Sequence, residues 1–146
     1  MRGLFKRLRD ERQGSVIVEF ALIAPVFIGM LLGVIHIGIA MQNYNALRGI
    51  SGDVARYAVV NYQTNNRLSK SQLEDYANGL ATNAPYGLSG DRFEAEMSPA
   101  TTQRVAGAVE YTLSLTYQVP TMLNVLGIDE VPISFSRPVF VIASTT

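Results

Sequence analysis

The longest apolar stretch of the chain lies near its N-terminus. From Phe20 to Met41 there is no formally charged residue, if His36 is counted as neutral. As a helix, these 22 residues span about 33 Å, close to the ~30 Å hydrocarbon thickness of a bilayer. A secretory signal has a shorter apolar region of about 7–15 residues, followed by a small-residue cleavage site. The pattern therefore predicts a membrane-spanning helix over residues 15–41. A buried core helix is disfavoured, because the residues that follow are too few to enclose it.

Past Met41 the apolar residues become confined to one side of a helix. They recur at steps of three and four residues, as Tyr44, Leu47, Ile50, Val54 and Tyr57. This stripe predicts an amphipathic continuation of the helix over residues 42–61. Gly49 and Gly52 each cost about 1 kcal/mol in a helix interior, so a local bend is expected near them.

The remaining chain changes from a helical to a two-residue period. Ser71-Gln72-Leu73-Glu74 has the form of a capping box, which predicts a second helix ending at Pro85. Apolar and polar residues then alternate over 109–119, which predicts a half-buried antiparallel strand whose apolar face packs on the stripe at 44–57. Shorter or less regular strands are expected at 92–97 and 131–143. Pro132 and Pro138 indicate an edge or a bulge in the last one, and a short helix is expected within 120–127.

These elements predict an α+β fold. A long N-terminal membrane-spanning helix continues into a small extracytoplasmic domain with a second helix and a small antiparallel sheet, in the form of a lollipop. The expected divisions are a basic leader at 1–14, the transmembrane helix at 15–41, its amphipathic continuation at 42–61 and an α+β head at 62–146.

Charge is unevenly distributed along the chain. The first fourteen residues carry five basic and two acidic side chains, 5 − 2 = +3, so the remaining residues sum to −3. No basic stripe is left outside the leader, which argues against nucleic-acid binding. A basic leader before a membrane helix predicts a cytoplasmic N-terminus and an exported remainder.

The sequence contains no pattern typical of an active site. Cysteine is absent, which excludes disulfides and thiolate metal sites. The single histidine, His36, lies in the apolar stretch, and no phosphate-binding glycine loop or metal-ligand spacing occurs. The adjacent acidic pairs Glu74-Asp75 and Asp129-Glu130 are expected to be solvated. We therefore expect neither an enzyme nor a cofactor.

Small residues follow one edge of the apolar helix. They occur every four residues, as Ala21, Pro25, Gly29 and Gly33. Gly29 and Gly33 form a GxxxG pair, which allows another helix to approach closely in lipid. A lipid-facing role for these glycines is equally compatible with the spacing.

The junction between leader and apolar helix carries the most specific chemistry. A peptidase that cuts after Gly14 would meet an unhindered backbone and would release Ser15 as a new N-terminus. Ser15 and Glu19 are four residues apart, on one face of a helix. Glu19 could compensate the new amino group of its own chain or that of a neighbouring subunit. Alternatively, Glu19 lies at the lipid headgroups near the positive end of the helix dipole.

The residues from Arg9 to Phe27, RDERQGSVIVEFALIAPVF, resemble TadE-like proteins of the tight-adherence (Flp) pilus system. So do Asn45-Ala46-Leu47-Arg48 and Asp53-Val54-Ala55-Arg56-Tyr57-Ala58, and the resemblance covers about residues 9–58. It implies a pseudopilin cleaved by a prepilin peptidase after Gly14. It also implies roles for Glu19 and Phe20 in subunit pairing, and a bacterial inner (cytoplasmic) membrane location with possible entry into a surface pilus.

The resemblance thus predicts a minor pseudopilin that acts in assembly, initiation or tip formation of such a pilus. Its implied partners are the prepilin peptidase, other pilins and pseudopilins in a homo- or hetero-oligomeric stack, the inner-membrane assembly platform and the lipid bilayer. One alternative is an unprocessed single-pass protein whose outer sheet domain binds a partner. A membrane-anchored enzyme is a third and weaker alternative.

Overall fold

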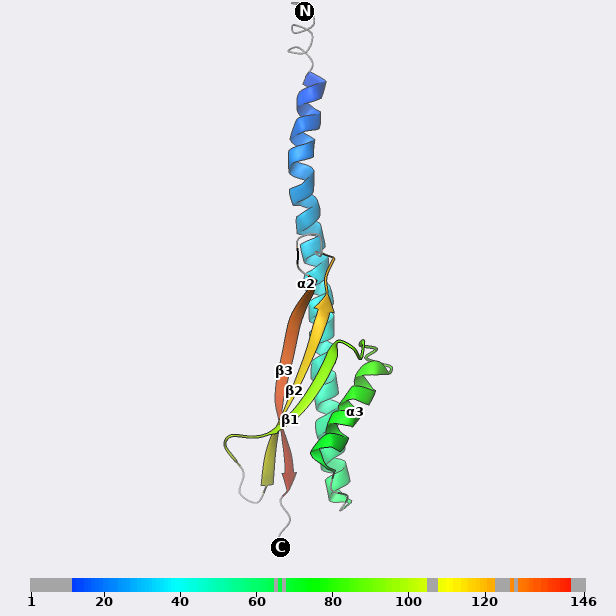
Figure 1. Ribbon diagram of the computed structural model, residues 1–146, viewed down its shortest axis with the longest axis vertical. Coiled ribbons are helices and arrows are strands. Elements are labelled where there is room, and N and C mark those ends of the chain that lie inside the picture. Colours follow the sequence, from blue (N-terminus) through cyan, green and yellow to red (C-terminus); the bar gives the residue numbers. More distant parts are fainter. Residues whose placement is uncertain are drawn as a thin grey trace, which may run out of the picture. The chain divides into compact units, whose positions relative to one another are not determined.

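The computed structural model describes residues 12–64, 66, 68–104, 108–122, 127 and 129–142 (Figure 1). The chain divides into two compact units, Met1–Gly38 and Ile39–Thr146. Its elements in order are α2 (Arg12–Gln63), α3 (Lys70–Thr82), β1 (Phe93–Pro99), β2 (Ala108–Pro120) and β3 (Glu130–Ile142). A long apolar helix, a second helix and a small antiparallel sheet make the fold α+β, as predicted.

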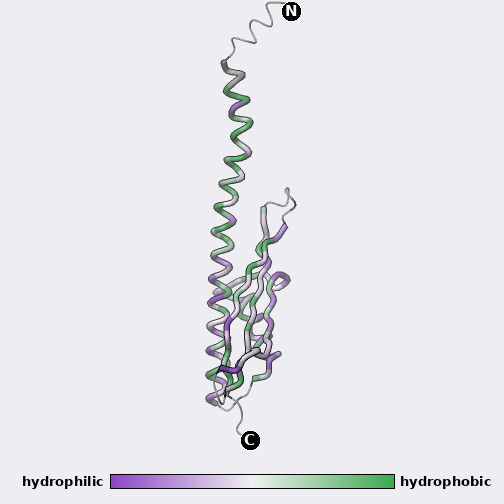
Figure 2. Tube along the Cα trace, turned by 90° about the vertical axis from the view of Figure 1, so that its left-hand side faces the viewer, coloured by the Kyte–Doolittle hydropathy of each residue, from purple (hydrophilic) through white to green (hydrophobic). Residues whose placement is uncertain are grey.

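Helix α2 is one uninterrupted helix and ends at Gln63, two residues beyond the predicted end. Its N-terminal part is coloured mainly as hydrophobic (Figure 2). The helix continues through Gly49 and Gly52, where other elements approach it closely. A Cβ on Gly49 would lie 2.6 Å from the ring of Tyr86, and one on Gly52 would lie 3.5 Å from Arg137 Nη1. The two glycines therefore leave room for side chains from distant parts of the sequence.

The sheet has the order β1-β2-β3 with both pairs antiparallel. The predicted strand at 109–119 is its centre, and the two flanking strands are longer than or offset from their predicted ranges. Pro132 and Pro138 pair with Gln118 and Thr112 in an unbroken register, so they mark an edge strand and not a bulge. Both prolines have even numbers, so their missing N–H groups point to the same side of the strand, away from β2.

The core of the second unit lies between the sheet and the two helices. Leu47, Ile50 and Val54 of α2 are fully buried, and so are Leu113 and Leu115 of β2. Tyr44 of α2 meets Phe135 of β3 edge to face, with ring centroids 5.8 Å apart. From α3, the cluster receives Leu73, Ala77 and Ala81. The predicted packing of the amphipathic stripe on the apolar face of the central strand is confirmed.

The start of α3 differs from the prediction. The capping box uses Ser69 and Gln72, not Ser71 and Glu74. Ser69 Oγ accepts from the Gln72 N–H at 3.2 Å, and Gln72 Oε1 accepts from the Ser69 N–H at 2.8 Å. The Glu74 carboxylate is engaged elsewhere, since its Oε1 accepts from the Met97 N–H of β1 at 2.7 Å. The expectation that Glu74 is simply solvated was therefore wrong.

The end of α3 also lies before the predicted one. The helix ends at Thr82, three residues before the cis-linked Pro85. The short helix expected within 120–127 falls largely on residues 123–126, which lie outside the described residues.

Candidate functional site

The predicted processing junction lies within the first turns of α2. Gly14 and Ser15 belong to the helix that begins at Arg12. Glu19 follows Ser15 by four residues in the same helix, which places the two on one helical face. Glu19 is exposed, and the neighbouring Phe20 side chain is 71% exposed. This part of α2 therefore presents a carboxylate and an aromatic ring at the start of an apolar surface.

That apolar surface follows α2 for more than twenty residues. The large hydrophobic side chains of this stretch are mostly exposed, from Val16 to Met41. A stretch of the helix between Val16 and Gln63 is long and apolar enough to cross a membrane, and little of it is buried within the chain. Exposed apolar area costs about 25 cal/mol per Å² in water, so this surface requires lipid or another helix. It fits a single-pass membrane protein.

The row of small residues is not used for packing inside the chain. Ala21 and Pro25 are exposed. An added Cβ on Gly29 or Gly33 would meet nothing within 4 Å. The space over the GxxxG pair is therefore open to lipid or to the backbone of a second helix.

A polar contact ties the loop after α3 to the outer part of α2. Tyr86 Oη donates to Asp53 Oδ2 at 2.9 Å. Partial burial raises the pKa of Tyr86 above its ordinary value of 10.0; the hydrogen bond to Asp53 and the charge of Asp53 add to this, while Arg56 opposes it. Burial and a nearby carboxylate both disfavour the phenolate. The contact stands above Gly49, whose lack of a side chain admits the tyrosine ring.

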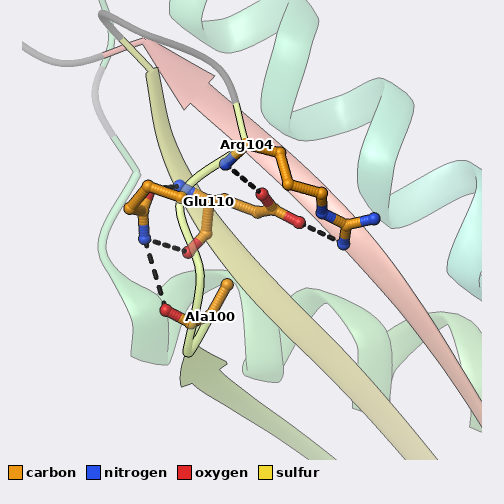
Figure 3. Close-up of polar contacts among 4 residues, drawn as sticks. Ala100, Arg104 and Glu110 are labelled. Carbon is orange, nitrogen blue, oxygen red and sulfur yellow. Dashed lines mark hydrogen bonds and ion pairs between the residues drawn. The ribbon is translucent and has the colours of Figure 1, made fainter.

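Glu110 is a buried carboxylate on the outer face of the sheet (Figure 3). The alternation of β2 predicts a solvated side chain here, yet Glu110 is only 1% exposed because the segment 100–104 covers it. Its Oε1 pairs with the Arg104 guanidinium, and its Oε2 accepts from the Arg104 N–H at 3.2 Å. Gln103 Oε1 accepts from the Glu110 N–H at 2.7 Å. The carboxylate therefore fastens the segment 100–104 to β2, a structural use of the charge.

A groove beside the edge strand contains two arginines that the sequence did not single out. Arg137 pairs with the buried Leu113 across the β2–β3 ladder, and directly paired residues share one face of a sheet. The Arg137 side chain therefore projects to the core side, where it reaches Gly52 of α2. Together with Arg56 and the valines at 59 and 60, it lines a groove of about 420 Å³.

A signal for Arg137 was present in the sequence. In β3 every odd-numbered position except Arg137 is apolar. These apolar positions are Val131, Ile133, Phe135, Val139 and Val141. A charged residue in an otherwise apolar strand face indicates a local opening in that face, and here the face returns to the core at Val139. Arg56 gives no such signal, since an exposed arginine on an amphipathic helix is ordinary.

The part of the chain that the structure describes contains no cluster of metal-ligating side chains. No three His, Asp or Glu side chains there gather closely enough to hold an ion. Glu130, half of one acidic pair expected to be solvated, makes an ion pair with Arg92, with Arg92 Nε and Glu130 Oε1 3.1 Å apart.

Comparison with known proteins bears on the apolar helix. Residues 14–56 match the family of TadE-like proteins. No curated protein and no solved structure matches the chain. The matched segment begins at Gly14, includes Glu19 and Phe20, and ends at Arg56 within α2. It indicates involvement in a Tad (Flp) pilus system and association with pilus components in general. The resemblance predicted from the sequence is confirmed over this segment, and residues 14–56 are similar to TadE-like proteins.

Proposed function

We propose that this protein is a minor pseudopilin of a tight-adherence (Flp) pilus, cleaved after Gly14 by a prepilin peptidase. The observation that carries the proposal is the family match, which begins at Gly14 and runs through Glu19 into the exposed apolar helix. Cleavage there removes the charged leader and leaves Ser15 as the N-terminus, one helical turn before Glu19.

The proposed mechanism is mechanical and needs no catalysis by this chain. The bilayer holds the apolar surface of α2 until the subunit moves into a helical stack. In the stack, neighbouring helices take the place of lipid, and Glu19 pairs with the new N-terminus of an adjacent subunit. A charge in an apolar, low-dielectric setting is costly without a partner, so this pairing favours the correct axial offset between subunits.

The membrane topology follows from the same proposal. The basic leader stays in the cytoplasm and the second unit lies outside, in agreement with the distribution of basic residues around the apolar stretch. The inner membrane is then the place where the peptidase, the assembly platform and the other pilins meet this subunit.

Intact mass of the full chain tests the cleavage directly. The chain is expressed with and without a prepilin peptidase and extracted in detergent, and its intact mass is measured by mass spectrometry. Loss of Met1–Gly14 only with the peptidase supports the proposal. A full-length mass in both samples would instead support a permanently anchored protein whose sheet domain binds a partner.

Variants at glycines make the cleavage test specific for position. Gly14→Leu is expected to block cleavage because a branched side chain obstructs the scissile bond, whereas Gly14→Ala leaves it slow or intact. Gly3→Leu, in the same leader, is the matched control and is expected to be cleaved like the wild type. Normal processing of Gly14→Leu would refute the proposed cleavage position.

A further inference from the structure

The groove beside β3 combines two cations with an apolar wall. Arg56 and Arg137 line it together with Val59 and Val60, whose side chains are 44% and 52% exposed. Among the described residues, no carboxylate lies within ion-pair distance of either guanidinium. The acidic residue nearest to Arg56 in sequence, Asp53, accepts from the Tyr86 hydroxyl. Arginine beside exposed apolar side chains is typical of the centre of protein interfaces.

The complementary surface lies on the other edge of the sheet. Glu94 and Glu96 of β1 are exposed and pair with Thr116 and Ser114, on the outer face of the sheet. Their positions i and i+2 put the two carboxylates on the same face of the strand, about 7 Å apart along it. Neither of them makes an ion pair within the described part of the chain. A two-charge acidic strand is thus available for a groove that carries two positive charges.

The edges themselves are poorly suited to strand addition. On β3, Pro132 and Pro138 lack the N–H groups that an added strand would need. On β1, the Met97 N–H is already bonded to Glu74 of α3. Contact between molecules at these edges is therefore expected to rely on side chains, and the charges of the groove and of β1 are complementary.

We propose that the groove of Arg56 and Arg137 binds the Glu94–Glu96 strand of a second copy of this chain. The groove borders β3 and the acidic pair is on β1, at opposite edges of the sheet. One copy then engages a neighbour on each side, which gives a head-to-tail contact and not a closed pair. The contact does not depend on cleavage after Gly14.

The test uses the full chain in detergent micelles and two neutralised double variants. Arg56→Gln/Arg137→Gln removes the groove charges and keeps the strand, whereas Glu94→Gln/Glu96→Gln does the reverse. Analytical ultracentrifugation of the wild type should show a series of oligomers whose size increases with protein concentration. Each variant alone should associate about tenfold more weakly, and high salt should weaken the wild type in the same direction.

A mixture of the two variants is the decisive sample, because it tests whether the groove of one copy binds the acidic strand of another. An intact groove on one partner can meet an intact acidic strand on the other only once, so the mixture should form a 1:1 dimer and stop. Recovery in the mixture also shows that both variants are folded. All variants keep the apolar helix, so association through α2 would persist in every sample.

Three results would overturn the proposal. These are a monomeric wild type, association that is unchanged in both variants, and a wild type that stops at dimers. As none of them concerns the mass after peptidase treatment, failure of this contact and failure of the proposed processing are separate results.

Discussion

Within the second unit, a single glycine of α2 decides how closely the loop after α3 packs on this helix. Gly49 reads as a weak point in a helix, yet it lies under the Tyr86 ring, where a Cβ would come within 2.6 Å of Tyr86 Cε1 and Oη. Its cost in helix propensity is offset by the contact it permits, the 2.9 Å hydrogen bond between Tyr86 and Asp53. Such a role cannot be read from the local sequence, because Tyr86 is 37 residues further along the chain.

Gly49→Ala is expected to lower the free energy of unfolding by about 1 kcal/mol. Displacing the tyrosine and its hydrogen bond costs more than the ~1 kcal/mol that alanine adds to helix propensity. Gly79→Ala in α3 is the matched control, since a Cβ there meets nothing within 4 Å. That control should raise stability by about 0.5–1 kcal/mol. Chemical denaturation of the detergent-solubilised chain measures both, and equal gains for the two variants would contradict the role given to Gly49.

Tyr86 should also make stability depend on pH at the alkaline end. Its pKa is raised in the folded state above 10.0, chiefly by burial and then by Asp53. Above about pH 10 the unfolded tyrosine loses its proton first, so the unfolded state binds fewer protons and stability falls as pH rises. Below pH 10 both states hold the proton and the dependence vanishes.

Tyr86→Phe isolates this contribution from that of the other six tyrosines. The stability difference between wild type and variant should be constant to about pH 9 and should then shrink toward about pH 11. Denaturant titrations at a series of pH values measure it. A difference that stays level through this range would show that the tyrosine is not held as its neutral form.

At the scale of elements, the start of α3 could be capped by either of two serines, Ser69 or Ser71, and only one of them is used. Ser69 and Ser71 each stand three residues before a glutamine or glutamate, the spacing of a capping box, and the predicted box is that of Ser71 and Glu74. In the structure Glu74 is bonded to the Met97 N–H of β1 and Gln72 closes the box with Ser69. Tertiary contact with the sheet thus decides which of two locally adequate caps is used.

Ser69→Ala is expected to cost about 1 kcal/mol of stability, because the Gln72 N–H loses its acceptor at the helix start. Ser71→Ala, inside the first turn, should change stability by less than about 0.5 kcal/mol. Thermal unfolding followed by circular dichroism compares the two. A larger loss for the Ser71 variant would restore the cap predicted from the sequence.

At the scale of the whole molecule, the apolar part of α2 and the second unit suit different solvent environments. The first is exposed along its length and suits lipid, whereas the second buries its own core. Glu19 is a carboxylate at the start of the stretch that suits lipid. Within the proposed function, it must therefore be tolerated at the membrane and also pair with a neighbouring subunit.

Glu19→Ala is expected to leave cleavage and membrane insertion intact while reducing recovery in assembled pili at least severalfold. The reason is that the pairing proposed between subunits loses a charge, whereas an apolar residue at this position suits lipid. The intact mass checks processing, and the sheared pilus fraction checks assembly. Asp75→Ala, an exposed charge in α3, is the control and should assemble normally. Full assembly of Glu19→Ala would favour a headgroup position for this carboxylate.

The sequence by itself determined the elements whose pattern is repeated many times. The apolar stretch at 20–41, the stripe at 44–57 and the alternation at 109–119 each involve many residues that share one environment, so a few exceptions do not hide the period. The α+β class, the packing of stripe on strand and the TadE-like segment could therefore be predicted.

Only the tertiary structure decided the features that depend on one residue meeting another far along the chain. These are the choice of Ser69 as the cap, which goes with the bond from Met97 to Glu74, the space left by Gly49, and the approach of Arg137 to α2. A single charge or glycine has several locally acceptable environments of similar free energy. Which one it occupies is fixed by the long-range packing that brings its partner within a few ångströms.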